Sequence, residues 1–172
     1  AKEAVAAGAS IVNDVSAGRF DKDMFVAVAQ LNVPYIAMHM QGTPQTMQQN
    51  PEYNDVVSEV RDSLREVCNR AAVAGIIDII IDPGFGFGKT VAHNFQLLKG
   101  MHTLGILGKP ILAGISRKSM ICKTLGVTPE HALNGTTALN IIALQQGANI
   151  LRVHDVKEAM ETVRLWHSFQ SY

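Results

Sequence analysis

The sequence predicts an α/β fold built on a parallel sheet. Short runs rich in β-branched residues recur along the chain, and segments with helical periodicity separate them. The runs are apolar almost without interruption, which is typical of strands covered on both faces, as in a parallel sheet. Alternation of such strands with helices selects the α/β class. The expected strands are Ser10–Asp14, Pro34–Met40, Asp78–Asp82, Pro110–Ser116 and Asn149–His154.

Helical patterns fill the segments between these runs. Over Asp55–Ala74, apolar residues recur at intervals of three or four while charged residues occupy the opposite side, and Gly75 is placed to end the helix. The first residues, Lys2–Ala7, have the composition of a helix end that leads into Gly8. We therefore expect the repeat to begin in the middle of a strand–helix unit.

Two further helices are expected near the C-terminus. Thr128 followed by Pro129 is typical of a helix start, and the helix predicted from there runs to Gly147. Gly135 lies inside it and costs roughly 1 kcal/mol relative to Ala, which predicts close packing at that point. The last helix is expected to begin at Asp155–Glu158, whose spacing is that of a capping box with Asp in place of Ser or Thr.

The repeated strand–helix units predict a barrel that is incomplete. A (β/α)8 barrel has eight units and typically needs about 250 residues, whereas this chain of 172 residues accommodates five units. We therefore expect a partial TIM (β/α)8 barrel, with about five of its eight units, folded as one domain over residues 1–172. The chain does not begin with Met, which leads us to expect that the natural protein starts further upstream.

The composition indicates a globular protein that acts on small molecules. Hydrophobic residues make up 47% of the chain and charged residues 17%, which is enough apolar side chain for a substantial core. Because 15 basic residues balance 15 acidic ones, no net charge attracts nucleic acid or an anionic membrane surface. No run is long enough to span a membrane. Cys68 and Cys122 lack metal-ligand spacing, so we expect reduced thiols in a cytoplasmic protein.

Polar residues stand at the end of every predicted strand. In parallel α/β folds, ligands bind at the carboxyl ends of the strands, where helix N-termini and loops converge. A single polar residue there usually caps a helix or anchors a loop, and we interpret Asp14 and Asp155 in that way. Polar residues at five ends together favour a binding site. These residues are Asn13, Asp14, His39, Asp82, Ser116 to Lys118, Arg152, His154 and Asp155.

The richest of these ends is the segment DPGFGFGK, residues 82–89. Its glycines permit backbone shapes that other residues resist, so the chain can approach a ligand closely. A Walker phosphate loop would need glycine at Pro83 and a dinucleotide fingerprint would need glycine at Lys89, so the segment belongs to neither class. Asp82 can accept two parallel hydrogen bonds from a guanidine-like edge, such as that of a pterin. The alternative is that Asp82 caps the next turn.

The last two strand ends carry cations. Ser116–Ser119 follows an apolar strand and opens a helix, so its N–H groups, hydroxyl and cations are expected to face an anion or a carboxylate. The alternative is a solvated basic turn. Arg152 and His154 lie two residues apart, which places both on one face of the last strand, the interior of a barrel. An inward arginine needs an anionic partner, which is either a bound anion or a neighbouring acid such as Asp14 or Asp155.

The second strand ends on a histidine between two methionines. A histidine in this setting more often packs or anchors a loop than binds a ligand, so we assign His39 no catalytic role. Met38 and Met40 lie on the opposite face from His39, and Met38 can make a soft apolar contact with a flat ring.

Together these segments resemble the dihydropteroate synthase family. IVND, MHMQGTPQTMQ, DPGFGFGK, GISRKS and RVHD occur in that order, and the resemblance covers all 172 residues. Each segment is a weak signal alone, but jointly they are a strong one. The resemblance implies a transferase of folate biosynthesis and a target of sulfonamides. It would join 6-hydroxymethyl-7,8-dihydropterin diphosphate to 4-aminobenzoate, giving 7,8-dihydropteroate and diphosphate.

The resemblance also implies a role for each matching residue. Asn13 and Asp82 are expected to bind the pterin edge, with Met38 packed beside the ring. Lys118 is expected to contact the carbonyl side of the pterin and to lie beside the aminobenzoate.

The remaining roles concern the second substrate and the leaving group. Ser116 and Phe87 resemble the aminobenzoate site, and Arg152 and His154 resemble the diphosphate pocket. Lys118, Arg152 and His154 are therefore the expected catalytic residues. Loss of diphosphate leaves a ring-stabilised cation, so these residues would hold the leaving anion and orient the amine with little acid–base work.

The resemblance also implies elements that we do not find here. The first three strand–helix units of the family are absent, and with them a loop whose asparagine helps to hold Mg²⁺ and diphosphate, a second loop, and an aspartate of the third strand. We therefore expect Mg²⁺ as cofactor but no metal ligand in this chain, a homodimer when complete, and little or no activity from the chain alone. Five strands also leave two sheet edges unpaired, which favours association.

Two alternatives stay open. One is the pterin-binding domain of a methyltetrahydrofolate-dependent methyltransferase, which shares the barrel but is not expected to carry SRKS and RVHD together. The other is a truncated, non-catalytic module that binds pterin weakly or serves in assembly.

Overall fold

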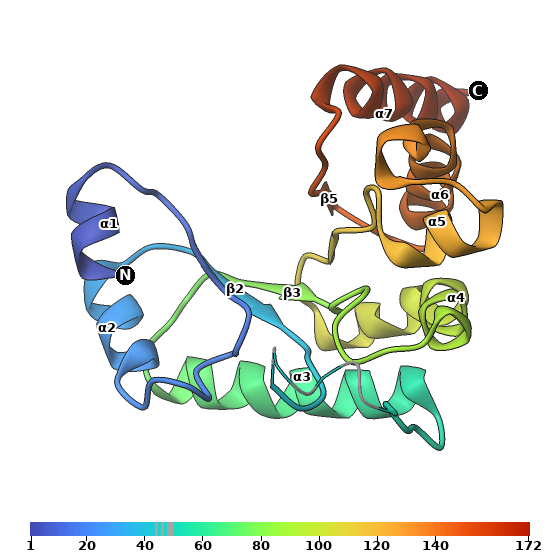
Figure 1. The fold of residues 1–172 in the computed structure, drawn as a ribbon. Coiled ribbons are helices and arrows are strands. Elements are labelled where there is room, and N and C mark those ends of the chain that lie inside the picture. The colour runs from blue at the N-terminus through green and yellow to red at the C-terminus, as the bar shows by residue number, and fades with distance from the viewer. Residues whose placement is uncertain (44, 46, 48–49) are drawn as a thin grey trace.

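The computed structural model describes residues 1–43, 45, 47 and 50–172. Within this part of the chain, strands and helices alternate as the sequence predicts, and every predicted strand is present (Figure 1). The MHMQGTPQTMQ segment lies partly outside the described residues. The strands are β1 (Val12–Asp14), β2 (Tyr35–Met38), β3 (Ile79–Asp82), β4 (Leu112–Ala113) and β5 (Ile150–Leu151).

All of these strands run parallel, in the order in which they occur along the chain. β1, β2 and β3 form one ladder, and β4 and β5 form a second. A parallel bridge between Ile81 and Ile111 links the two ladders. The regular ladder of β4 and β5 is shorter than predicted, although the N–H of Arg152 still donates to the carbonyl of Ala113 at 3.0 Å. The α/β class with a parallel sheet is therefore confirmed.

The helices cover one side of these strands. In Figure 1, α1 and α2 lie near the N-terminus, α3 runs below β2 and β3, and α5 to α7 gather at the opposite end near the C-terminus. The helices are α1 (Lys2–Ala6), α2 (Met24–Leu31), α3 (Val56–Val73), α4 (Val91–Gly100), α5 (Ser119–Leu125), α6 (Leu133–Gln145) and α7 (Val156–Ser171), with 3-10 turns at η1 (Met101–Leu107) and η2 (Pro129–His131).

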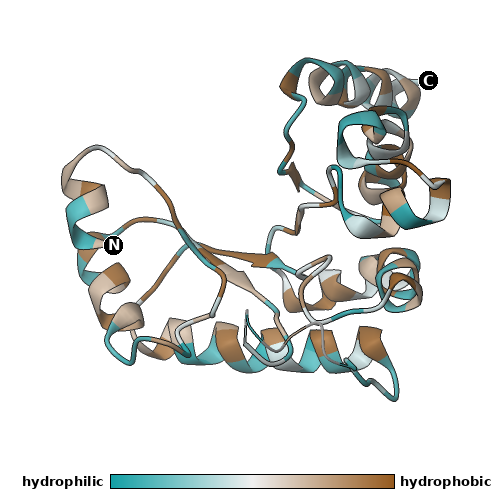
Figure 2. Cartoon of the chain, in the orientation of Figure 1, coloured by the Kyte–Doolittle hydropathy of each residue, from teal (hydrophilic) through white to brown (hydrophobic). Residues whose placement is uncertain are grey.

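Helix α3 confirms the amphipathic prediction. Asp55 caps it by accepting a hydrogen bond from the N–H of Val57 at 3.1 Å, and Gly75 follows its end with a φ of 97°. The apolar bands of this helix are visible along its length in Figure 2. Its buried side chains pack against the strands and are Val56, Val60, Leu64, Val67, Cys68 and Ala71.

Two predictions about the C-terminal helices differ from the structure, the start of α6 and the capping box of α7, although α7 does begin after Asp155 as predicted. The segment after Thr128 forms the separate 3-10 turn η2 before α6, because the carbonyls of Pro129 and Glu130 accept hydrogen bonds from the Arg117 side chain. Asp155 does not form the predicted capping box, because both of its carboxylate oxygens are bound by Arg117.

The close packing predicted at Gly135 is confirmed. A Cβ at this position would lie 2.4 Å from Cγ2 of Ile121 on α5, so a larger residue would push the two helices apart.

Alternate residues of each strand face opposite sides. Tyr35, Ala37, Ile79 and Ile81 join the hydrophobic cluster between the strands and the helices. Residues at the intervening positions, such as Met38 and its register partner Asp82, face the other way. That second face leads to the polar strand ends.

Both cysteines are free thiols, with Cys68 buried and Cys122 partly buried. Among the residues that the structure describes, no helix is long and apolar enough to cross a membrane.

Candidate functional site

The first feature of the site is a carboxylate shared by two partners. Asp82 is 0% exposed at the end of β3. Its Oδ1 accepts the N–H of Gly84 at 2.8 Å, and its Oδ2 accepts a bond from Nη2 of Arg152 at 2.7 Å. Asp82 thus anchors the next turn through Oδ1, as the alternative interpretation predicted, and accepts one bond from a guanidinium through Oδ2.

Arg152 joins strands that are distant in sequence. Its Nη1 donates to Oδ1 of Asn13 at 3.0 Å, while Nη2 binds Asp82. The neighbouring acids considered as its partners, Asp14 and Asp155, are not used, because each is already bound elsewhere. Its side chain is 41% exposed, so only part of the guanidinium is withdrawn from water.

Asp14 is a loop anchor, as predicted. Its carboxylate accepts hydrogen bonds from the N–H and hydroxyl of Ser16, the N–H of Gly18 and the hydroxyl of Tyr35. Although burial acts in the opposite direction, these bonds hold the pKa of Asp14 below its usual value. The bonds stabilise the charged form, so the turn after β1 stays fixed.

The glycine-rich loop that follows Asp82 is held from inside. Lys89 is 3% exposed, and its Nζ lies 2.9 Å from Nδ1 of His39, 3.0 Å from the carbonyl of Gly84 and 3.1 Å from that of Phe87. Gly84 has a φ of +71°, and a Cβ there would lie 1.8 Å from the carbonyl oxygen of His39. The loop therefore folds tightly around the lysine and against the end of β2.

Burial dominates the ionisation of this pair. It lowers the pKa of Lys89 to about 7, with the charge of Asp82 opposing the shift and that of Lys118 adding to it. Burial, followed by the charges of Lys89 and Arg19, lowers the pKa of His39 to about 3. His39 is thus a neutral acceptor for Lys89, which agrees with its interpretation as a loop-anchoring residue.

Lys118 lies against the outside of the same loop. Its Nζ donates to the carbonyl of Phe85 and lies 4.3 Å from the centre of the Phe87 ring. Gly86 leaves room for this side chain, because a Cβ there would lie 2.9 Å from Cδ of Lys118. Burial lowers the pKa of Lys118 to about 8, while Asp82 raises it and Arg152 lowers it further. Its contacts with Phe85 and Phe87 place Lys118 beside the loop that follows Asp82.

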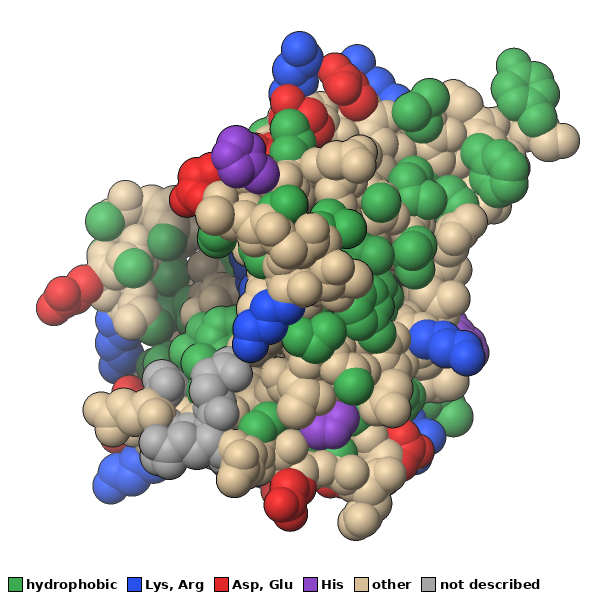
Figure 3. All heavy atoms as spheres, turned by 45° about the vertical axis from the view of Figure 1, so that its right-hand side comes forward, with side chains coloured by type: hydrophobic (Ala, Val, Ile, Leu, Met, Phe, Trp, Pro, Cys, Tyr) green, Lys and Arg blue, Asp and Glu red, His purple; other side chains and the backbone are tan. Residues whose placement is uncertain are grey.

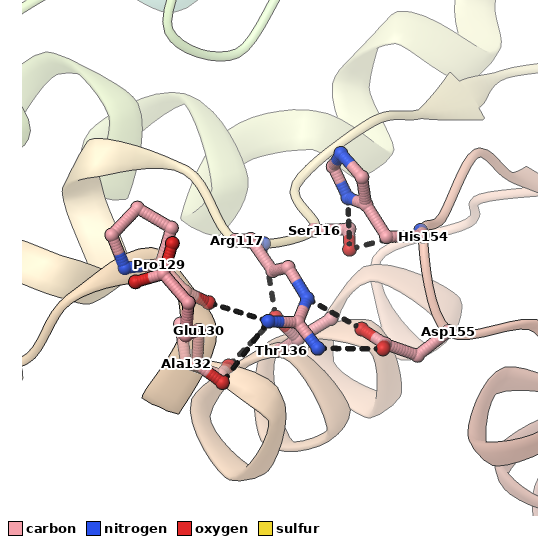
Figure 4. A network of polar contacts seen from close by, with 8 residues as sticks. All are labelled: Ser116, Arg117, Pro129, Glu130, Ala132, Thr136, His154 and Asp155. Carbon is pink, nitrogen blue, oxygen red and sulfur yellow. Dashed lines mark hydrogen bonds and ion pairs between the residues drawn. The ribbon is translucent and has the colours of Figure 1, made fainter.

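Ser116 and His154 form a separate pair. The hydroxyl of Ser116 lies 2.9 Å from Nδ1 of His154 and accepts the backbone N–H of His154 at 3.2 Å (Figure 4). The prediction that Arg152 and His154 share one face is met only in part, because both follow the last paired residue of β5. Arg152 reaches across to β1 and β3, whereas His154 turns to the neighbouring β4 end.

The expectation that all cations of Ser116–Ser119 face one place is wrong. Arg117 turns away from Lys118 and binds Asp155 through two hydrogen bonds of 2.9 and 2.7 Å (Figure 4). Its φ of 54° directs the side chain backwards towards η2, where it also meets two carbonyl oxygens. Of these two cations, only Lys118 remains beside the loop of residues 82–89.

Several contacts were missed from the sequence, among them the Lys89–His39 pair and the Arg117–Asp155 pair. Lys89 stands at the end of an apolar motif, and no acidic residue is adjacent to it in the sequence. Nothing in the order of residues indicates that its ammonium group donates a hydrogen bond to a histidine 50 positions away. Arg117 and Asp155 do stand in matching places, each directly after a strand-end residue of the site. That matched placement was the available signal.

The structure provides no metal site among the residues it describes, since no three His, Cys, Asp or Glu side chains are grouped so as to hold an ion. The Mg²⁺ implied by the resemblance therefore finds no set of ligands in this part of the chain.

Comparison with known proteins identifies the group to which this arrangement belongs. A family model described as pterin binding enzyme matches residues 1–154. Dihydropteroate synthase of Escherichia coli K12 is 43% identical over 166 residues, which are 95% of this chain and 58% of that protein.

Two solved structures agree closely with the fold. Dihydropteroate synthase of Yersinia pestis in a sulfonamide drug complex has a TM-score of 0.95 and 39% identity, over 98% of this chain and 62% of that one. The Xanthomonas albilineans enzyme in complex with 7,8-dihydropteroate has a TM-score of 0.90 and 44% identity, over 98% of this chain and 62% of that one. The chain thus spans about three fifths of these relatives, and it belongs to the family of pterin-binding enzymes.

Proposed function

We propose that this chain carries the pterin and diphosphate half of a dihydropteroate synthase site. The reaction would join 6-hydroxymethyl-7,8-dihydropterin diphosphate to 4-aminobenzoate, giving 7,8-dihydropteroate and diphosphate. The observation that carries the proposal is the buried carboxylate of Asp82, which binds a guanidinium through Oδ2. The guanidinium donates to Asp82 through one nitrogen and to Asn13 through the other, and a pterin likewise offers two neighbouring donors, a ring N–H and an amino group on one carbon.

Substrate binding at Asp82 would release Arg152. The pterin edge and the Arg152 guanidinium compete for the same oxygen, so only one can be bound at a time. An arginine released there lies near Lys118, whose pKa it affects, and both cations then face the diphosphate of the substrate. Asn13, which holds the other end of the guanidinium, becomes free for the pterin.

The remaining roles follow from position. Phe87, with its ring against Lys118, is proposed to line the aminobenzoate side. The resemblance assigns Ser116 to that side as well, but its buried hydroxyl is bound to His154, so we propose that it acts on the diphosphate side instead. Met38 is proposed to pack beside the pterin, because it lies opposite Asp82 in the register of β2 and β3. His154 is proposed to hold the diphosphate together with Arg152.

The proposed chemistry is a displacement at carbon. The amine nitrogen of 4-aminobenzoate forms a bond to the methylene carbon of the pterin, and the carbon–oxygen bond to diphosphate breaks. Diphosphate leaves with the electron pair, and the amine loses one proton to water. The cations Lys118 and Arg152 stabilise the charge that develops on the leaving group, while the ring contacts orient the amine.

We also propose the larger setting. The five strand–helix units would be part of an eight-unit barrel in a longer cytoplasmic protein, with residues 1–172 forming one domain and Mg²⁺ accompanying the diphosphate. The relatives' greater length supports this, as do the two free thiols.

Hydrophobic side chains exposed over α5, α6 and α7 support a homodimer through that face (Figure 3). The SRKS and RVHD segments contact each other, which favours the synthase over a pterin-dependent methyltransferase.

The test is to extend the chain upstream in its source and to assay it with the pterin diphosphate, 4-aminobenzoate and Mg²⁺. We expect dihydropteroate from the extended protein and little or none from the isolated chain. Asp82→Asn should abolish pterin binding measured by calorimetry, whereas Asp78→Asn, at the other end of the same strand, should leave it unchanged. An extended protein that bound the pterin diphosphate but formed no dihydropteroate would contradict the synthase assignment.

A further inference from the structure

Ser116 is a buried serine whose hydroxyl contacts His154. It is 3% exposed, and both contacts that its hydroxyl oxygen makes within the described residues go to His154. One is the backbone N–H of His154, which donates to the oxygen. The other is Nδ1 of the imidazole ring, at 2.9 Å. The close view in Figure 4 shows the ring standing over the serine with its other nitrogen turned away.

The position of the shared proton follows from what the serine can bind. If Nδ1 carried the proton, Ser116 would accept twice and its own buried hydroxyl proton would have no acceptor, which costs about 1–3 kcal/mol. If instead the hydroxyl donates to Nδ1, every group of the pair is satisfied. The neutral imidazole then carries its proton on Nε2, the nitrogen that points away from Ser116.

A second set of contacts fixes the position of Ser116 relative to His154. Arg117 follows Ser116 in the chain, Asp155 follows His154, and these two residues bind each other through both carboxylate oxygens. The N–H of Arg117 also donates to Oγ1 of Thr136 on α6 at 3.0 Å. Because the residues directly after Ser116 and His154 are joined, the ends of β4 and β5 cannot slide past each other without breaking this ion pair.

We propose that Ser116 is a positioning residue that holds His154 in the Nε2–H tautomer, so that His154 presents one directed N–H donor to an anionic oxygen. The identity of that anion, a diphosphate, rests on the proposed function. The tautomer itself does not, because it follows from contacts within the chain. In this arrangement the hydroxyl of Ser116 serves the diphosphate side of the site, and its effect on aminobenzoate would be minor.

The tautomer is measured directly by nitrogen-15 NMR of the isolated chain without ligand. His154→Gln identifies the His154 signals among those of the six histidines. We expect the wild-type ring to show the Nε2–H form when neutral, Ser116→Thr to keep it, and Ser116→Ala to give a mixture of both forms. Ser171→Ala, which removes an exposed hydroxyl bound to the His167 carbonyl, should leave it unchanged.

An Nδ1–H form or an averaged ring in the wild type would overturn the proposal, and so would a Ser116→Ala ring that keeps a single Nε2–H form. The wild-type spectrum decides the first point even if the alanine variant does not fold. If the extended protein is active, Ser116→Ala should raise KM for the pterin diphosphate by about tenfold. KM for aminobenzoate should change little, and Ser116→Thr should restore the former. The reverse pattern would return Ser116 to the aminobenzoate side.

Discussion

The loop after β3 and the segment after β5 meet at the same site but are held in opposite ways. The loop of residues 82–89 is fastened from within, since Lys89 is buried and bonded to two of the loop's own carbonyls. The segment after β5 has one backbone bond to its neighbour, from the N–H of Arg152 to the carbonyl of Ala113, and its other contacts involve side chains, with the Arg152 side chain 41% exposed. The difference indicates that the loop of residues 82–89 is a rigid part of the site, which we call the binding frame. The segment after β5 instead carries Arg152, which can leave the carboxylate of Asp82 when a ligand binds.

We expect the largest effect on stability from a substitution in the binding frame at Gly84, where the loop packs against β2. Gly84→Ala places a Cβ 1.8 Å from the carbonyl oxygen of His39, so the loop must move away from β2. We expect a loss of more than about 4 kcal/mol in the free energy of unfolding measured with urea. Gly108→Ala is the matched control, because Gly108 has a φ of +61° but no atom near its missing Cβ, and should lose only about 1–2 kcal/mol.

We expect the next largest effect on stability from removing the Lys89 ammonium group, which holds the loop from inside. Lys89→Met leaves Nδ1 of His39 and the carbonyl of Phe87 without their donor, although the loss is partly offset because no ammonium group has to be buried. We expect about 2–3 kcal/mol of destabilisation in urea unfolding. Lys99→Met, at an exposed position of α4, should change stability by less than about 0.5 kcal/mol. Equal effects would contradict the role of Lys89.

The burial of His39 against the binding frame should also make the stability of the chain depend on pH. The pKa of His39 is about 3 in the folded chain because burial opposes its charge, and 6.5 is its ordinary value. Between these values the unfolded chain binds a proton that the folded chain does not, so stability falls as pH falls. The loss should be about 2 kcal/mol between pH 6.5 and 5, since each pH unit is worth about 1.4 kcal/mol. Lys89, with a pKa of about 7, is mostly charged in both states across this window.

His39→Gln tests this assignment. The variant should lose the His39 part of the pH slope in urea unfolding, while His167→Gln, at an exposed position of α7, should retain it. A His39→Gln slope equal to that of the wild type would show that another group causes the acid sensitivity.

The smallest effect on stability is expected at the displaceable arginine. Arg152→Ala removes one bond to Asp82, which keeps the N–H of Gly84, so we expect about 1–2 kcal/mol, between the values for exposed and buried ion pairs. In the protein extended upstream, however, both Arg152→Ala and Lys118→Ala should lower kcat by roughly 100-fold with the fold retained. Arg164→Ala on α7 is the control. Unchanged kinetics in both site variants would remove these residues from the proposed mechanism.

The sequence was most informative where one residue and its neighbours decide the outcome. Gly135 predicted close helix packing, Asp55–Ala74 predicted α3, and Asp14 was identified as a loop anchor. In each case the cause is local, namely a missing Cβ, a repeat of apolar residues, or a carboxylate near turn N–H groups. The site residues at the strand ends also followed from local order, because parallel strands bring their carboxyl ends together.

Pairings across the fold were beyond the reach of the sequence. Whether Arg152 binds Asp14, Asp82 or Asp155 depends on which strand faces it. The predicted start of α6 and the predicted capping box of α7 were wrong because Arg117 reaches Pro129 and Asp155. The amino-acid sequence by itself determined the α/β class, the positions of the strands and the polar strand ends. The tertiary structure decided which charges meet, because the energy of a polar contact depends on distance and burial, and neither is encoded in the spacing of residues along the chain.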